Sequence, residues 1–395
     1  MNYKINEYIV WILQKLIINY IKGQGAYIMN IFLYIIWNTA YYKKEEIIKD
    51  LEISFTVHKI LEIYWTPERF SENLSRFYGQ KLPPKSFKEK ACGIGPFTLV
   101  VIEDKAPQYN LRKTSRGKDE NVNIHTFDKK ILYREWTKPE SRIVHSRIHG
   151  TNTIEETEHD LTLLTGLCPK EFIERKNDLP SIMKCDLVGA DGWRDLKQLF
   201  YVLKYTCKYT VLRNFEGFPD AFHVGEHADI DILAENYEDV KRICKARAVF
   251  KSKRRVQCMV DISGTPTQFD FRYVGDGYYD LQWEKDILAN RIEKNGIYIP
   301  DEFNYKYMLL YHALIHKLEV ARDYTTRLDA MFGKKKWNRV VLINFLKDKG
   351  YSFSEPRDLS VYFNPRFVKQ RVSVHRFIKN TRIALQRKIR KLIGG

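Results

Sequence analysis

Residues 224–233 read Val-Gly-Glu-His-Ala-Asp-Ile-Asp-Ile-Leu, an apolar run that holds two aspartates two residues apart. Side chains alternate between the faces of a β-strand, so Asp229 and Asp231 would share one face while the isoleucines that follow them enter a core. Two carboxylates on one face repel each other unless a cation lies between them, and Mg²⁺ is commonly held by one or two carboxylates together with substrate phosphates. The pattern therefore predicts half of a metal site for chemistry on a nucleotide. The alternative is that both aspartates are solvent-facing strand residues.

A third carboxylate lies downstream in residues 268–274, which read Gln-Phe-Asp-Phe-Arg-Tyr-Val and predict another short strand. Asp270 is central in this run between aromatic neighbours, and Asp261 on the preceding predicted strand is the competing choice. We favour Asp270 because of its central place. With Asp229 and Asp231 it could hold two Mg²⁺ ions, a pair that activates an attacking oxygen and stabilises a pyrophosphate leaving group.

The chain resembles the polymerase-β-type nucleotidyltransferase superfamily over roughly residues 186–320. The resemblance is carried by residues 209–216, by Gly225 and by the strand with the two aspartates. The resemblance implies Mg²⁺- or Mn²⁺-dependent transfer of a nucleotidyl group from a nucleoside triphosphate. Asp229 and Asp231 would bind both metals, and Asp270 would bind the catalytic metal and help deprotonate the acceptor. Gly225 would allow close approach of the backbone to phosphate, although Glu226 and His227 follow it where the superfamily usually has Gly-Ser or Gly-Gly.

Two cations are candidates for binding the nucleotide phosphates. Arg213, on a predicted strand before the glycine, would neutralise phosphate, with a structural salt bridge as an equal alternative. Lys317 is expected near the phosphates if the predicted helix 305–320 packs over the catalytic sheet. His312 and His316 share a face of that helix, but no glutamate lies between them in the HExxH arrangement, so we expect structural histidines rather than zinc ligands.

The acceptor is left open between a sugar phosphate or glycan precursor, a protein hydroxyl and an RNA end. The cations of residues 241–255 follow the carboxylate strand closely and are expected to take an anionic substrate tail. The basic residues 366–391 alternate with apolar ones, which is typical of an amphipathic helix. This helix would lie on an anionic membrane or nucleic acid, or dock on its own domain.

The composition agrees with anionic partners. The chain has 395 residues, enough for two or three domains, and its formal net charge is +17. A basic enzyme from a Lys- and Ile-rich proteome is the plain alternative, and this composition suggests an AT-rich bacterial or viral genome. Six scattered cysteines without a CxxC pair favour free thiols in a reducing, cytoplasmic compartment.

Residues 1–28 form an expected N-terminal helical extension, with Met29 as an alternative start. No run of eighteen uncharged apolar residues occurs in the sequence, so we expect no membrane span. The extension would pack on the body of the protein or lie on a membrane surface, as a peripheral protein does.

Residues 29–170 show alternating strand and helix patterns in a β-α-β-β-α order, which predicts a ferredoxin-like domain. Residues 148–161 resemble the stretch around the phosphorylated histidine of nucleoside diphosphate kinase. His149 falls on that histidine, and Thr151 and Asp160 fall on the residues that support it. The phosphate-gripping cations of the family are missing, so we expect a degenerate, non-catalytic copy.

The predicted protein is therefore α/β (α+β), with a ferredoxin-like N-terminal domain, a linker at 171–185, a mixed-sheet nucleotidyltransferase domain at 186–300 and a helical extension at 301–395. Its expected activity is Mg²⁺-dependent nucleotidyl transfer to an anionic acceptor. The alternatives are a phosphotransferase that uses His149 and a non-catalytic anion-binding scaffold. The sequence leaves the oligomeric state open.

Overall fold

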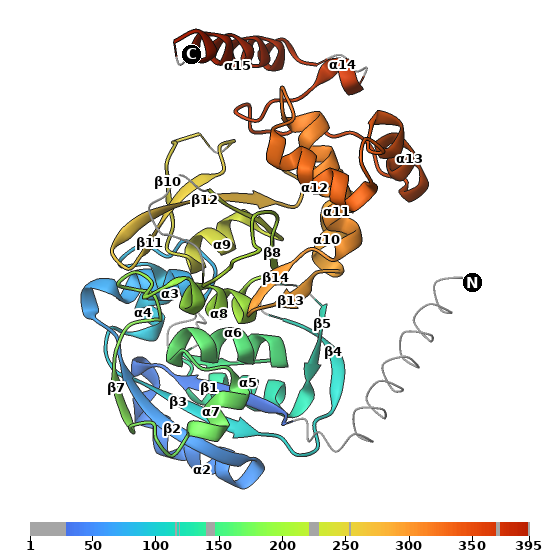
Figure 1. Cartoon of the computed structure of the whole chain (residues 1–395). Coiled ribbons are helices and arrows are strands. Elements are labelled where there is room, and N and C mark those ends of the chain that lie inside the picture. Colours follow the sequence, from blue (N-terminus) through green and yellow to red (C-terminus); the bar gives the residue numbers. More distant parts are fainter. Residues whose placement is uncertain are drawn as a thin grey trace. The chain divides into compact units, whose positions relative to one another are not determined.

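The computed structural model describes residues 29–114, 117, 119–139, 147–220, 229–252, 254–368 and 372–393. Helices and mixed sheets make this an α+β protein (Figure 1). The chain forms two compact units. The first unit comprises Met1–Pro67, Phe87–Leu161 and Leu167–Cys185, and the second comprises Glu68–Ser86, Thr162–Gly166 and Asp186–Gly395.

The first unit is built on a five-stranded sheet with the order β6-β1-β3-β2-β7. β3 runs antiparallel to both β1 and β2, and β6 runs antiparallel to β1. Both β1 and β3 are buried along their whole length, as their continuous apolar sequences predict. The strands are β1 (Ile31–Ile36), β2 (Thr56–Tyr64), β3 (Phe97–Glu103), β6 (Ile148–Gly150) and β7 (Ile182–Lys184).

Two helices share a core with one face of this sheet. Ile47 and Leu51 of α2 (Lys44–Ser54) and Tyr133 of α5 (Ile124–Trp136) pack with Phe32 and Tyr34 of β1. The Asn123 side chain accepts a hydrogen bond from the backbone N–H of His125, which caps α5 at its start. The other elements are η1 (Asn38–Lys43), α4 (Phe87–Cys92), β4 (Tyr109–Lys113), β5 (Asp119–Asn123) and α7 (Pro169–Arg175). α6 (Ile154–Thr165) is divided, since its residues from Thr162 onward belong to the second unit.

The segment 171–185, interpreted from its polar residues as a linker, contains the end of a helix and a short strand, joined by a turn. α7 covers its first part, and β7 then joins the sheet parallel to β2. β7 is short and mostly exposed, with burial alternating along Ile182, Met183 and Lys184. A strand this short at a sheet edge has little apolar sequence to distinguish it from a loop.

The second unit is built on the sheet β10-β11-β12-β9-β8. β11 and β12, the two strands predicted around Asp261 and Asp270, form a hairpin, and β9 lies parallel to β12 and antiparallel to β8. β8 ends at Val211, so the strand predicted to carry Arg213 is shorter than expected. The strands are β8 (Tyr209–Val211), β9 (Ile230–Ala234), β10 (Arg247–Ala248), β11 (Gln257–Ile262) and β12 (Thr265–Tyr273), with a separate pair β13 (Ile292–Lys294) and β14 (Ile297–Ile299).

Helices from three parts of the sequence belong to the second unit. η2 (Pro67–Arg69) precedes α3 (Phe70–Phe77), and residues 68–86 pack in this unit although the sequence interpretation placed them in the first domain. α8 (Leu196–Thr206) and α9 (Tyr237–Ile243) begin at the caps Asp195 and Asn236, whose side chains accept backbone N–H groups.

The C-terminal part of the second unit is helical, as expected. Trp283, Tyr311 and Phe345 are buried in one aromatic-rich core that joins several of these helices. They are α10 (Leu281–Ala289), α11 (Glu302–Tyr311), the π-helical turn η3 (His312–His316), α12 (Arg322–Phe332), α13 (Arg339–Lys349), α14 (Pro365–Val368) and α15 (Val374–Ile393). Over the residues that the structure describes, no helix combines the length and apolar character that crossing a bilayer requires.

Candidate carboxylate site

Two of the three predicted carboxylates are direct neighbours across the second sheet. Asp231 of β9 and Asp270 of β12 are register partners in the parallel pairing of these strands. Both residues are 8% exposed. Side chains of partner residues in adjacent strands project from the same face, so the two carboxylates lie on one face of the sheet. Local sequence explains this placement, since Ile230 and Ile232 on one strand and Phe269 and Phe271 on the other are buried on both sides of them.

Asp229 lies immediately before β9 and is exposed. It precedes Asp231 by two residues, which is the spacing that alternation requires for a shared face. Burial and the charge of Asp231 raise the pKa of Asp229. The predicted glycine turn, with Gly225, lies outside the described residues.

The electrostatics of Asp270 reflect crowding of negative charge. The pKa of Asp270 is raised from 3.8 to about 6. Burial is the largest cause, the carboxylates of Asp231, Asp229 and Asp358 act in the same direction, and Arg272 opposes them. Its Oδ1 atom is buried and has no hydrogen-bond partner among the described residues. An unpartnered carboxylate oxygen in such a place is costly unless another ligand completes it.

Arg213 lies against Asp231, with 2.6 Å between Nη2 and Oδ2. Its Nη1 atom lies 2.9 Å from the hydroxyl of Tyr278 and 3.2 Å from Nδ1 of His312. Burial disfavours the charged guanidinium, yet the charge of Asp231 prevails and the pKa of Arg213 is raised. The structure thus gives Arg213 the salt bridge that the sequence interpretation held as an alternative to phosphate binding.

Lys317 follows η3 and belongs to the same electrostatic environment. Burial and then the charge of Arg213 lower its pKa, while Asp231 and Asp323 raise it. Its ammonium lies 6.0 Å from the ring centroid of Tyr324. The positive charge of Lys317, like that of Arg213, opposes the rise in the pKa of Asp229. Five of the predicted site residues therefore gather at one place: Asp229, Asp231, Asp270, Arg213 and Lys317.

Three further residues of the site escaped sequence reasoning. Nη2 of Arg272 lies 3.4 Å from Oδ2 of Asp270, and Nη1 lies 3.8 Å from Oδ2 of the buried Asp358. The Nε2 atom of Gln257 lies 3.5 Å from the same oxygen of Asp270. Alternation along the strand could have indicated Arg272, and the hairpin register pairs Gln257 with Asp270. Asp358 is distant in sequence and left no signal.

The competing carboxylate Asp261 lies elsewhere on the sheet. It pairs with Pro266 near the tip of the hairpin and is exposed. Its backbone oxygen accepts a hydrogen bond of 3.0 Å from the Trp193 N–H. Asp261 therefore lies on the same sheet as Asp231 and Asp270 but outside the carboxylate site.

The donor atoms suit a hard divalent cation, since carboxylate oxygens are the ligands that Mg²⁺ prefers. The unpartnered Oδ1 of Asp270 and the raised pKa values fit such a cation. Across the described part of the chain, no group of three or more His, Cys, Asp or Glu side chains is arranged to hold a metal ion. The residues therefore suit an ion held by the Asp231 and Asp270 pair, with the remaining ligands supplied by a substrate.

The two histidines of the π-helical turn are buried beside this site. Burial, followed by positive neighbours, lowers the pKa of both His312 and His316 well below the ordinary value, so both are neutral. Nδ1 of His312 lies 2.8 Å from the Tyr278 hydroxyl. His312 thereby helps to hold Arg213 in place.

In the first unit, the structure brings His149 and Asp160 together, with 2.6 Å between Nε2 and Oδ2. His159 lies 2.8 Å from the other oxygen of Asp160. Burial acts to raise the pKa of Asp160, but the two histidines outweigh it and the pKa is lowered. The hydroxyl of Thr151 accepts hydrogen bonds from the Leu33 N–H and from Thr157.

The second unit thus holds a buried pair of carboxylates flanked by arginine and lysine, and the first holds a histidine oriented by a carboxylate. A scan against models of protein families, a search of curated proteins and a search of solved structures found no match to this chain.

Proposed function

We propose that the second unit is a Mg²⁺-dependent nucleotidyltransferase. The observation that carries the proposal is the register pairing of Asp231 with Asp270, both buried, on adjacent parallel strands. Two buried carboxylates side by side repel each other, which costs free energy of folding. A bound cation with a phosphorylated substrate offsets this cost, so such a pair is typical of a functional site. The alternating Asp229-Ile230-Asp231-Ile232 sequence at the start of β9 also agrees with the resemblance to polymerase-β-type enzymes.

In the proposed reaction an acceptor oxygen attacks the α-phosphorus of a nucleoside triphosphate, and the bond to the β-phosphate breaks to release pyrophosphate. Mg²⁺ held by Asp231 and Asp270 would offset the negative charge of the phosphates. Arg213 fixes the Asp231 carboxylate through its 2.6 Å contact. Asp270, with a pKa of about 6, is a carboxylate at neutral pH and is suited to accept the proton of the acceptor. Lys317 supplies an ammonium for the phosphates.

The first unit is proposed to be a ferredoxin-like domain. Neighbouring strands in the order β6-β1-β3-β2 are antiparallel, and α2 and α5 lie in the connections from β1 to β2 and from β3 to β6. This order supports the split β-α-β arrangement of that fold. β7 extends the sheet beside β2.

The proposal is tested by thermal unfolding with each of the four ribonucleoside triphosphates, with and without Mg²⁺. A ligand at a hundred times its dissociation constant adds about 2.7 kcal/mol of stability. We expect at least one triphosphate to stabilise the wild type in Mg²⁺ only, and to lose this effect in Asp231→Asn.

The matched control is Asp261→Asn, a carboxylate of the same sheet outside the site. It should keep the ligand-induced shift. Since Asp231→Asn leaves Arg213 with a neutral partner, its unliganded stability will fall, and only the shift on adding ligand is compared. The nucleotidyltransferase proposal would be refuted if no triphosphate stabilised the wild type. It would also be refuted if the ligand-induced gain in stability were equal in Asp231→Asn.

A second candidate, phosphotransfer through His149, is favoured by the 2.6 Å contact with Asp160. A carboxylate hydrogen-bonded to a ring nitrogen orients the imidazole for nucleophilic attack. This candidate predicts acid-labile phosphate on the protein after incubation with labelled ATP, present in Asp231→Asn and lost in His149→Gln. Absence of label from the wild type would exclude it.

A further inference from the structure

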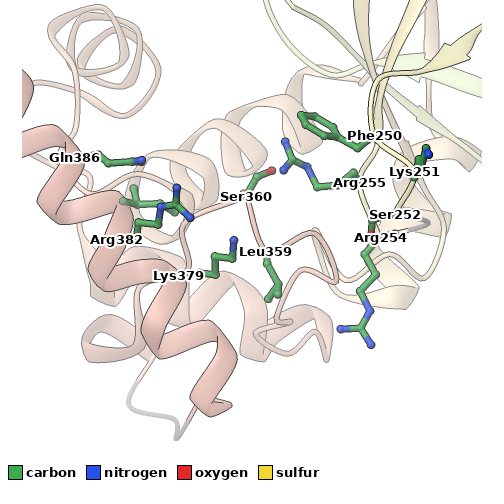
Figure 2. Close-up of a pocket in the computed structure, with 11 residues that line it drawn as sticks. Phe250, Lys251, Ser252, Arg254, Arg255, Leu359, Ser360, Lys379, Arg382 and Gln386 are labelled. Atoms are coloured by element: carbon green, nitrogen blue, oxygen red, sulfur yellow. Dashed lines mark hydrogen bonds between the residues drawn. The ribbon is translucent and has the colours of Figure 1, made fainter.

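A basic pocket of about 630 Å³ lies in the second unit (Figure 2). Two segments far apart in sequence form its walls: the loop between β10 and β11, and the face of α15 with the residues that precede it. Figure 2 shows Lys379, Arg382 and Gln386 of α15 on one side and the β10–β11 loop on the other, with Leu359 and Ser360 between them. The lining residues are Phe250, Lys251, Ser252, Arg254, Arg255, Leu359, Ser360, Lys379, Arg382, Ile383 and Gln386.

Five of the lining side chains are cationic, and none of the lining residues is acidic. Arg255 has a partial counter-charge, with 3.5 Å between its Nε and Oδ1 of Asp358. Within the described part of the chain, the other four (Lys251, Arg254, Lys379 and Arg382) form no ion pair with a carboxylate. Like charges that converge on one cavity without counter-charges repel each other, and a multivalent anion relieves that repulsion.

The α15 wall is fixed by buried contacts rather than being a loosely placed surface helix. Arg376 of α15 is fully buried. Its Nε donates to Oε1 of Glu355 at 3.1 Å, and its Nη1 donates to the carbonyl of Val361 at 2.6 Å. Asn380 donates to the carbonyl of Phe363 at 2.6 Å. These contacts tie α15 to the segment 355–363, so Lys379 and Arg382 are held facing the pocket.

The opposite wall leads directly to the carboxylate site. The guanidinium of Arg255 lies 3.8 Å from the ring centroid of Phe250, and its Nε donates to Oε1 of Gln257 at 2.8 Å. The amide of Gln257 in turn lies 3.5 Å from Asp270. One glutamine therefore separates a wall of the pocket from the carboxylate that is proposed to deprotonate the acceptor.

We propose that this pocket binds the acceptor substrate, and that the acceptor is a small molecule carrying two or more phosphate groups. The acceptor role rests on the proposed nucleotidyl transfer. A volume of about 630 Å³ is that of a small-molecule site. Leu359 and Ile383 add an apolar surface for the non-phosphate part of the molecule, and Gln386 with the serines adds neutral hydrogen-bonding groups. Cations that converge in this way favour a compact polyanion over an extended strand, whose phosphates require a groove that follows the backbone.

The test is equilibrium dialysis of the full chain with inorganic tripolyphosphate in EDTA at fixed ionic strength. The pocket variant is Arg254→Gln/Arg382→Gln, which removes one exposed cation from each wall. The matched control is Lys285→Gln/Lys347→Gln, which removes two exposed cations from α10 and α13 of the same unit. Lys317→Gln reports on phosphate bound at the nucleotide site instead.

We expect the pocket variant to bind tripolyphosphate about tenfold or more weakly than the wild type, since charge-assisted hydrogen bonds from both walls are lost. The control and Lys317→Gln should bind within about twofold of the wild type, the change expected from exposed charges alone. Unchanged binding by the pocket variant, or loss of binding in Lys317→Gln, would overturn the assignment. Stronger binding, per phosphate, of a single-stranded RNA of about 20 nucleotides would overturn the small-molecule class. Because the dialysis contains neither Mg²⁺ nor nucleotide, its result can be read even if the proposed nucleotidyl transfer fails.

Discussion

Asp270 is the residue at which the stability of the fold and the proposed chemistry oppose each other. Its pKa is raised to about 6 because burial and three neighbouring carboxylates outweigh Arg272. The folded protein therefore binds this proton more tightly than the unfolded chain does. The stabilising contribution is complete below the unfolded pKa near 4 and is lost as the pH rises through 6. At neutral pH the ionised side chain destabilises the metal-free fold.

The substitution Asp270→Asn should consequently stabilise the metal-free protein at pH 8. Two units of pKa correspond to a gain on the order of 1–3 kcal/mol, because Asn removes the charge and Arg272 keeps Asp276 and Asp358 within 4 Å. The gain should disappear near pH 4.5. Urea unfolding at both pH values, with the exposed Asp261→Asn as control, measures it. A variant less stable than the wild type at pH 8, with no dependence on pH, would contradict this electrostatic account.

The core of the carboxylate site could be predicted from sequence because short-range alternation defines it. Asp231 and Asp270 each stand in an apolar run, and the hairpin and the β9 strand form where those runs predict them. The surrounding contacts depend on long-range packing. Asp358 reaches Arg272 from a segment without a recognisable pattern, and no periodicity in the sequence indicates such a contact.

At the scale of elements, α3 packs with elements of the second unit that are distant from it in sequence. Arg76 of α3 is buried, and its Nη2 donates to the carbonyls of Val188 at 2.7 Å and Ile243 at 3.1 Å. Arg242 of α9 donates in return to the carbonyl of Gly79 at 2.9 Å. These bonds satisfy backbone oxygens that are buried at Ile243 and partly buried at Val188 and Gly79. They explain why residues 68–86 belong to the second unit, which helix periodicity alone could not reveal.

The substitution Arg76→Met should destabilise the second unit by about 2–4 kcal/mol, because one buried and one partly buried carbonyl lose a charged donor. Hydrogen exchange should quicken in α9 and around residues 186–190, while β1 and β3 of the first unit keep their protection. Arg69→Met, at an exposed ion pair preceding the same helix, is the control and should change little. Faster exchange in β1 instead of α9 would show that α3 belongs with the first unit.

For the whole molecule, the sequence predicts the class and the buried strands, and misses the exposed strands β4, β5 and β7 and the interleaving of the two units in sequence. The buried strands β1 and β3 and the hairpin β11–β12 are recognisable because their side-chain patterns are local. β7 is not, since it is a short edge strand. The net charge of +17 is the basis for the prediction of an anionic partner, and it does not say where such a partner would bind. The fold concentrates part of that charge in one pocket, by bringing the β10–β11 loop and α15 together.

The central claim is that the Asp231 and Asp270 pair holds a divalent cation together with a nucleotide. It is tested most directly by electron paramagnetic resonance of Mn²⁺, titrated into the full chain with the triphosphate that stabilises it. We expect the free Mn²⁺ signal to fall in the wild type and in Asp261→Asn. The bound fraction should decrease about tenfold or more in Asp231→Asn and in Asp270→Asn, because each removes one carboxylate ligand. Equal Mn²⁺ binding by all four proteins would contradict the claim.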